Sequence, residues 1–321
     1  MTDRLVVASS PHIHSPLDTR KIMGLVLAAL APAGLAGICF LGLRSLLVIL
    51  TCVISCVGSE YAWQYLRGRR QTVSDLSAAV TGLLLAYNLP PTIPLWMAVC
   101  GSLFAIVIVK QFYGGLGCNI VNPALAGRAM MLISWPVAMT TWTVHGVSGA
   151  TPLALMKAEA AKDVPPLLNL LIGNVGGCIG ETSVLALLLG GAFLMWKGII
   201  SWRIPAAYIL TTAALGPVFG HTGGLLMPSF YEAAAGGLML GAIFMATDYT
   251  TSPVTEKGQF IFALGCGFLT ALIRTWGGYP EGVSYSILMM NLTVPLIDRA
   301  TAPRILGAAG GTGTAAKEAG K

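Results

Sequence analysis

Long apolar runs alternate with short polar segments along the whole chain. A helix that crosses the hydrocarbon core of a bilayer needs about 20 residues, and ten of the runs approach or reach this length. They cover residues 22–43, 45–64, 75–89, 92–112, 122–143, 179–196, 204–220, 231–247, 259–275 and 282–298. The pattern predicts an all-α membrane protein with about ten transmembrane helices.

A repeated block divides these runs into two sets of five. Residues 78–85 resemble residues 233–240, and each copy is followed by a proline turn. The interval from that proline to a later glycine pair is the same in both copies, as Pro90 to Gly114 and Pro253 to Gly277 show. Because five is an odd number of crossings, the second copy must be inverted in the membrane. Two inverted five-helix repeats are an architecture of transporters, whose interrupted helices meet near the midplane.

Composition supports a membrane location and excludes several classes of protein. Of the 321 residues, 55% are hydrophobic and 10% charged, whereas about a quarter are charged in soluble domains. The 39 glycines suit closely packed helices in lipid. The chain has no dinucleotide fingerprint, no Walker sequence and no iron–sulfur spacing among its seven cysteines, so no metal site is predicted. The net charge of +6 comes without an aromatic-interleaved basic patch, so nucleic acid is not an expected partner.

The distribution of basic residues predicts the orientation of the chain. If the N-terminus is cytoplasmic, fourteen Lys and Arg residues fall in inside segments, four fall outside, and Arg128 lies within a span. This asymmetry follows the positive-inside rule. The predicted divisions are a cytoplasmic arm 1–21, a first five-helix repeat 22–143, an external loop 144–178, a second five-helix repeat 179–303 and a disordered cytoplasmic tail 304–321.

The external loop contains the short polar turn Ser148-Gly149-Ala150-Thr151-Pro152-Leu153. Small neighbours leave the Thr151 hydroxyl uncrowded, and the following proline biases Thr151 toward an extended backbone. Loops of this kind carry chemistry more often than packing. The hydroxyl is therefore expected to be able to accept a large modification. These residues alone also fit an ordinary Ser/Thr-rich turn.

The run from Ser148 to Thr151 resembles the flavinylation motif of a family of membrane subunits. The family contains D subunits of Rnf-type ion-translocating oxidoreductases and B subunits of sodium-pumping NADH:quinone oxidoreductases. The resemblance implies that a separate flavin transferase attaches FMN through its phosphate to Thr151, with Ser148, Gly149, Ala150 and Pro152 beside it. It also allows a second, non-covalent riboflavin among the spans.

The resemblance extends over nearly the whole chain. Ser10-Pro11-His12, followed by Thr19-Arg20-Lys21-Ile22-Met23, resembles the polar arm that precedes the first span in Rnf D subunits. The stretch from Gly114 to Leu125 resembles the family's turn into the fifth span. Its glycines lack the lysine of a phosphate loop and predict a tight chain reversal. One position departs from the family: His145 stands where an aspartate is usual, and it is expected beside the flavin or to have no role.

Ionisable residues in or beside spans are candidates for ion movement, because charge there is costly. Asp248 is the strongest, since neighbouring hydroxyls on Thr247, Tyr249, Thr250 and Thr251 can supply oxygen ligands. The other candidates are Glu60, Asp75, Glu181 and Glu232. Structural alternatives exist for each. Glu60 is able to pair with Arg67 or Arg70, Asp75 is able to cap the third span, and Lys110, Arg128 and Arg274 are expected to extend toward an interface.

Three functions fit these features. The first is an inner-membrane prokaryotic subunit that carries electrons through FMN while its complex couples ferredoxin:NAD electron transfer to Na⁺ or H⁺ translocation; other subunits are then required. The second is the quinone-reductase homologue of the same family. The third is a stand-alone channel or transporter, suggested by Asn122-Pro123-Ala124, although Asn291-Leu292-Thr293-Val294-Pro295 in the second repeat is no matching triplet. No catalytic side chain is predicted in any of them.

Overall fold

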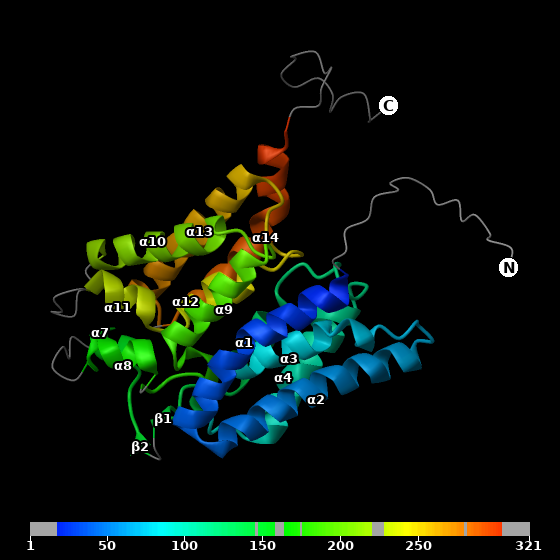
Figure 1. Cartoon of the computed structure of the whole chain (residues 1–321), viewed down its shortest axis with the longest axis horizontal. Coiled ribbons are helices and arrows are strands. Elements are labelled where there is room, and N and C mark those ends of the chain that lie inside the picture. Colours follow the sequence, from blue (N-terminus) through cyan, green and yellow to red (C-terminus); the bar gives the residue numbers. More distant parts are fainter. Residues whose placement is uncertain are drawn as a thin grey trace, which may run out of the picture.

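The computed structural model describes residues 18–144, 147–157, 164–173, 175–219, 228–278 and 281–303. In these ranges the chain is mostly helical (Figure 1). The described strands form one short antiparallel hairpin of β1 (Thr143–Val144) and β2 (Val147–Ser148). The motif around Ser10 and the tail 304–321 lie outside the described residues, as does His145.

The first half of the chain forms helices joined by short turns. Asp18 caps the first of them, because its carboxylate accepts from the Thr19 amide at 2.8 Å. The elements are α1 (Thr19–Leu41), α2 (Leu43–Leu66), η1 (Val73–Asp75), α3 (Ser77–Tyr87), α4 (Leu95–Leu103) with its π-helical continuation η2 (Phe104–Gln111), α5 (Pro123–Ser134) and α6 (Pro136–Met139).

The second half begins with short elements and continues with longer helices. The short ones are α7 (Pro152–Lys157), α8 (Leu167–Ile172) and η4 (Ile179–Glu181). The others are α9 (Val184–Trp196), α10 (Arg203–Val218), α11 (Pro228–Ala234), α12 (Leu238–Leu240) with its π-helical continuation η5 (Gly241–Met245), α13 (Glu256–Trp276) and α14 (Val283–Thr301).

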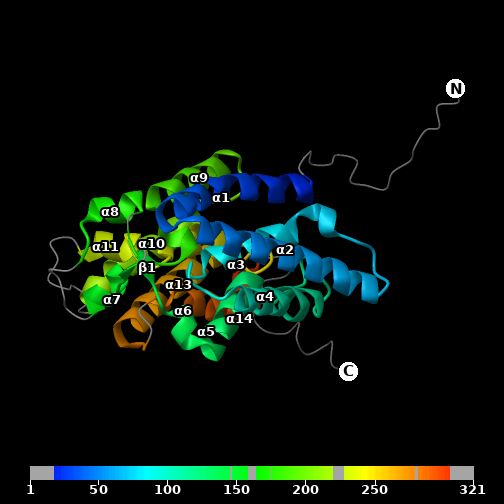
Figure 2. The same ribbon diagram turned by 90° about the horizontal axis from the view of Figure 1, so that it is seen from below.

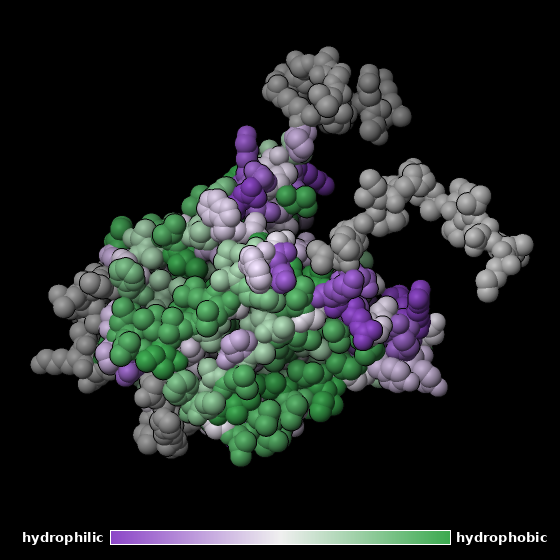
Figure 3. Space-filling model, viewed as in Figure 1, coloured by the Kyte–Doolittle hydropathy of each residue, from purple (hydrophilic) through white to green (hydrophobic). Residues whose placement is uncertain are grey.

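Three described helices, α1, α2 and α13, are long and apolar enough to cross a membrane. Large aliphatic side chains on the helix surfaces are exposed, among them Leu35, Ile54 and Leu189. Figure 3 shows such apolar side chains spread over the helical body, with polar residues gathered near the upper and right-hand edges. This distribution suits a lipid environment, because soluble proteins rarely expose apolar patches of this extent.

Two predicted spans break inside their predicted bounds at a proline or at glycines. The run 122–143 breaks at Trp135, because Pro136 lacks an amide hydrogen and disfavours the helical backbone in the residue before it. The run 231–247 breaks at Gly236 and Gly237, whose φ angles of 70° and 68° lie in the left-handed region that glycine tolerates. The predicted reversal after η2 is confirmed: Gly114, Gly115 and Gly117 all have positive φ.

The two halves of the chain share one core. Helices α1 and α9 lie side by side in both views (Figures 1 and 2), and Gly190 of α9 approaches the Ala29 backbone so closely that a Cβ would clash. Tyr87, at the end of α3, donates to the Leu30 carbonyl of α1 at 2.8 Å. These contacts join the two halves into one helical body. We call the end of this body that carries Thr151 the Thr151 end, and the end that carries Asp248 the Asp248 end.

Candidate functional site

Thr151 lies at the start of α7, and its hydroxyl oxygen accepts from the Ala154 amide at 3.2 Å. Gly149 and Ala150 before it are exposed, but Thr151 is only 6% exposed and Pro152 is buried. The expectation of an open loop hydroxyl therefore needs correction. Packing of α7 turns this residue inward, so the hydroxyl lies at a cavity wall.

This Thr151 cavity has a volume of about 380 Å³, within the range of roughly 300–1,000 Å³ typical of small-molecule sites. Its walls come from α5, the β-hairpin region, α7 and α14. The residues that line it include Arg128, Thr140, Trp142, Gly149, Ala150, Thr151, Glu281 and Tyr285. Ser148 lies in β2, directly before this wall.

Arg128 is the centre of a hydrogen-bond network in the cavity wall. It is 5% exposed and forms an ion pair with Glu281. Its other donors reach Asn88 Oδ1 at 2.9 Å, Ser284 Oγ at 3.1 Å and Cys178 Sγ at 3.7 Å. The guanidinium is therefore fixed by α3, α14 and the segment before η4. The expectation that Arg128 extends toward an interface is wrong.

Glu181 lies near this network. One atom each of Cys178, Glu181 and Glu281 fall within 4.8 Å of one another, and Glu181 Oε1 is buried without a hydrogen-bond partner. Arg128 already donates to Cys178 and Glu281. Two of the three candidate ligand groups are thus already engaged by a guanidinium, which disfavours a metal ion among them.

Glu232 forms a second buried ion pair at the Thr151 end. Its partner is Arg274 of α13, and both side chains are at most 1% exposed. Arg274 also donates to the Glu232 carbonyl at 2.6 Å and the Ala235 carbonyl at 2.9 Å. These bonds hold the arginine inside the protein, which corrects the expectation that it extends outward.

Glu60 lies toward the Asp248 end of α2 and is fully buried. It pairs with Lys110 at 3.1 Å, not with Arg67 or Arg70, and accepts from Gln111 Nε2 at 2.7 Å. Lys110 also donates to Ser77 Oγ at 2.6 Å. The charges of Glu60 and Lys110 thus neutralise each other inside the helical body.

Asp75 performs the capping role that the sequence allowed. Its Oδ1 accepts from the Ser77 amide at 2.8 Å and from the Ser77 hydroxyl at 2.6 Å, where α3 begins. The backbone needs this support, because Leu76 between them has a positive φ of 66°, which is uncommon for a residue with a branched side chain.

Asp248 lies in the turn after η5. Thr250 and Thr251 donate their hydroxyls to Asp248 Oδ2 at 3.0 and 3.3 Å. Thr247 and Tyr249 instead donate to backbone carbonyls of Ile243 and Ile199. Burial raises the pKa of the Asp248 carboxyl, and the threonine hydrogen bonds act in the opposite direction.

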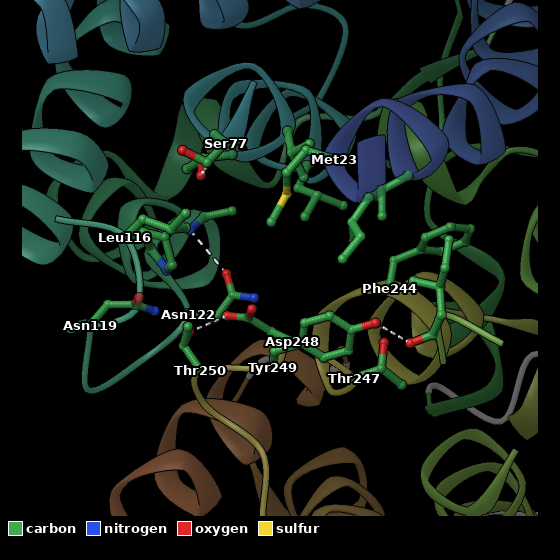
Figure 4. Close-up of a pocket in the computed structure, with 18 of the residues that line it drawn as sticks. Met23, Ser77, Leu116, Asn119, Asn122, Phe244, Thr247, Asp248, Tyr249 and Thr250 are labelled. Carbon is green, nitrogen blue, oxygen red and sulfur yellow. Dashed lines mark hydrogen bonds between the residues drawn. The ribbon is translucent and has the colours of Figure 1, made fainter. Parts of the chain in front are cut away.

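A second cavity, of about 260 Å³, adjoins Asp248. Figure 4 shows Asp248, Asn122 and Asn119 on one side of it and Ser77 and Met23 across from them. Most of its walls are apolar side chains of α1, α3, α9 and η5. It combines an apolar space with a few polar groups at one edge, as small-molecule sites do.

Sequence reasoning named Asn122 and Asn291 only as a possible channel triplet and did not predict that three asparagines are buried inside the helical body. Asn88, Asn122 and Asn291 are at most 3% exposed. Asn122 caps α5 through bonds to the Ala124 and Leu125 amides and donates to the Met245 carbonyl at 3.4 Å. The signal in the sequence is an amide side chain inside or beside an apolar run.

Comparison with known proteins assigns relatives over almost the whole chain. The NQR2, RnfD, RnfE family matches residues 6–307. The D subunit of the Na⁺-translocating ferredoxin:NAD⁺ oxidoreductase complex of Acetobacterium woodii is 53% identical, over 94% of this chain and 95% of its own. The D subunit of the proton-translocating ferredoxin:NAD⁺ oxidoreductase complex of Clostridium ljungdahlii is 46% identical, over 92% and 94%. The D subunit of the ion-translocating oxidoreductase complex of Escherichia coli is 37% identical, over 94% and 98%.

Proposed function

The chain belongs to the NQR2, RnfD, RnfE family, and from this premise we propose that it is the D subunit of an ion-translocating ferredoxin:NAD⁺ oxidoreductase complex. Two of these relatives, 53% and 46% identical, carry that name, and the third is named as the D subunit of an ion-translocating oxidoreductase complex; this chain covers each of them almost completely. Other subunits of the complex supply the entry and exit of electrons. Neither the quinone-reductase homologue nor a stand-alone channel is named among these relatives.

FMN esterified to Thr151 is the proposed redox group. The observation that carries this proposal is the position of Thr151 in the wall of a cavity of about 380 Å³. The residues present fit the group: Trp142 and Tyr285 offer apolar and aromatic surface, and Arg128 offers a positive charge. Small, exposed Gly149 and Ala150 lie directly before the attachment point. When bound, flavin supplies one- and two-electron chemistry, while the protein sets its position and potential.

The chain's own residues hold this site together. Thr151 Oγ1 can keep accepting from the Ala154 amide after esterification, because the ester replaces only the hydroxyl proton. Lys157, at the other end of α7, donates to the Gly277 carbonyl after α13. The helix that presents Thr151 is thus anchored at both ends.

The test is covalent flavin on one residue. The subunit is expressed beside its flavin transferase and examined for in-gel flavin fluorescence after denaturation. Thr151→Val should abolish the fluorescent band, whereas Thr140→Val, in the same cavity wall, should keep it. Mass spectrometry of the peptide that contains Thr151 should give the added mass of FMN less one water, which is lost when the phosphoester forms. An unmodified peptide from the native complex would disprove the assignment.

The cavity beside Asp248 is the proposed place for a second, non-covalent riboflavin. Its apolar walls suit a flat ring, and Asn119, Asn122 and Thr250 offer polar groups at one edge (Figure 4). Substitution of Thr81, which also lines it, by Phe should fill the cavity. Flavin released by denaturation of the purified complex should then fall, while covalent flavin stays unchanged.

We also propose that the chain crosses the membrane ten times as two inverted five-helix repeats, with Thr151 outside and both termini inside. The order of helices and turns along the described chain supports this. So does an inverted pair of contacts: Asn122, which caps α5, lies against Asn291 of α14, and Ser284, in the first turn of α14, lies against Arg128 of α5.

The Asp248 side chain is the proposed entry point for Na⁺ or H⁺. Hydroxyl oxygens of Thr250 and Thr251 gather at its carboxylate, and oxygen-rich sites suit small hard cations. Glu60 and Glu232 are weaker candidates, because each is already neutralised by a buried basic partner.

A further inference from the structure

The two halves carry equivalent polar positions in the middle of α5 and α14. Arg128 and Asn291 are separated along the chain by the same interval as the repeated prolines. Each bonds the residue two positions before its own proline. Arg128 donates to Asn88 Oδ1 at 2.9 Å, and the Asn291 amide, in the orientation that satisfies both of its groups, donates to the Thr251 carbonyl at 3.0 Å.

Each position also touches the beginning of the opposite helix. Arg128 donates to Ser284 Oγ of α14 at 3.1 Å. The Asn291 side-chain oxygen accepts from the Asn122 amide of α5 at 3.1 Å. The surroundings of Arg128 and Asn291 are therefore two copies of one polar site, related by the inversion of the repeats.

The two copies differ in charge. The copy at the Thr151 end holds the guanidinium of Arg128, paired with Glu281. The copy at the Asp248 end holds neutral Asn291, and Thr251 links it to Asp248. Among the described residues, no Lys or Arg forms an ion pair with Asp248. Carbonyls at interrupted helices, together with a carboxylate, are the groups that bind small cations in transporters.

We propose that Arg128 is a fixed cation that closes the Thr151-end copy, so that only the Asp248-end copy accepts a mobile monovalent cation. The proposal rests on the ion-translocating function above. An arginine suits this role because its guanidinium remains protonated even when buried. In the Thr151-end copy the guanidinium already takes the oxygen acceptors of Asn88, Ser284 and Glu281. A mobile cation that enters past Asp248 therefore finds these oxygen ligands occupied.

The test measures passive ion flux in the complete complex reconstituted in liposomes without an electron donor. A potassium gradient with valinomycin imposes the voltage, and entrapped indicators report Na⁺ and H⁺. The wild type should show little passive flux of either ion. Arg128→Asn, which installs the residue found in the other copy, should raise passive flux about tenfold or more, and added guanidinium chloride should suppress it. Arg128→Lys, which keeps the charge, is the matched control and should show passive Na⁺ and H⁺ flux as low as the wild type.

A second variant keeps the idea testable if Arg128→Asn does not assemble. Asn291→Lys places a fixed cation in the open copy and should abolish donor-driven ion uptake while covalent flavin is retained. Asn291→Gln, of similar size without charge, should still take up ions. Donor-driven uptake at the wild-type rate by assembled Asn291→Lys would overturn the proposal.

Other outcomes separate this proposal from the function on which it rests. An assembled, flavinylated Arg128→Asn complex that is as tight as the wild type overturns the fixed-cation role. If that variant also shows an altered flavin potential, Arg128 serves the flavin site alone. Absence of donor-driven uptake by the wild type would instead refute the translocating function, and it would leave the passive-flux comparison as a separate result.

Discussion

Buried ion pairs distinguish this chain at the scale of single residues. Lys110, Arg128 and Arg274 all turn inward to carboxylates, although each lies in or near the end of an apolar run. Removing water from two charges costs several kcal/mol. Their attraction offsets this cost only when the geometry is good and further hydrogen bonds form. Arg274 meets that condition, because two backbone carbonyls also accept from it.

The Glu232–Arg274 pair should therefore depend on both partners together. Arg274→Met alone leaves a buried carboxylate without its partner and should destabilise the subunit by about 3–5 kcal/mol. Glu232→Leu with Arg274→Met should recover most of this loss. Thermal unfolding of the detergent-solubilised complex checks the order. A double variant no more stable than the single one would mean that the pair acts through something other than its charges.

Asp248 should make ion uptake sensitive to pH. Because the pKa of this carboxyl is raised in the folded protein, the charged form is lost on acidification at a higher pH than for an ordinary aspartate. Below that pKa, apparent Na⁺ affinity should fall about tenfold per pH unit. Donor-driven uptake at several Na⁺ concentrations measures this dependence. Asp248→Asn should take up Na⁺ poorly, with little response to pH; a wild-type profile in that variant would exclude Asp248 from the path.

The identity of residue partners was the part least accessible from sequence. Charge within an apolar run correctly drew attention to Glu60, but its partner Lys110 lies far along the chain and follows from packing of α2 against η2. Capping by Asp75 was predictable, because it depends only on the two residues that follow. The hydroxyl cluster at Asp248 was half predictable: Thr250 and Thr251 bond it, whereas Thr247 bonds within its own helix.

At the scale of elements, interrupted helices position the functional groups. Helix α3 ends at Tyr87 before a proline turn, and Gly236 with Gly237 separates α11 from α12. The repeated sequence block predicted interrupted helices in both regions. The two-glycine break itself was not predicted, because hydrophobicity is insensitive to backbone angles. The break brings Gly237 against Glu181 and Gly236 against Leu153 of α7.

Gly237→Ala should disturb this region in two ways. Its φ of 68° is costly for alanine, and the new Cβ would lie 2.5 Å from Glu181 Oε1. We expect a loss of about 1–3 kcal/mol and weaker flavin fluorescence on Thr151. Gly278→Ala, where a Cβ meets no atom within 4 Å, is the control. Equal stability of the two variants in thermal unfolding would contradict the strain argument.

At the scale of the whole molecule, the two cavities lie at opposite ends of one helical body. Exposed Cys118 follows the glycine turn at the Asp248 end, and Ala150 is exposed at the other. The basic residues predict that the Asp248 end is cytoplasmic, and this orientation stays a prediction. Helices α1, α2 and α13 alone among the described helices have clear spanning length. The remaining spans are short or interrupted, so neither length nor hydropathy identifies them by itself.

Labelling from each side of the membrane tests the orientation. In a chain whose only cysteine is Cys118, a membrane-impermeant maleimide should react in inverted vesicles and not in intact cells. A chain whose only cysteine is introduced by Ala150→Cys should show the reverse. Reaction of both positions from the same side would exclude the ten-span arrangement.

The depth of Thr151 has a consequence for how the subunit matures. Thr151 is 6% exposed and its hydroxyl is engaged at the start of α7, so a second enzyme has little access to it once the surrounding helices have closed. Under the proposed flavinylation, attachment of the nucleotide comes first and docking of α7 follows. Biogenesis would then be a timed sequence in which an unmodified chain that closes early can no longer be repaired.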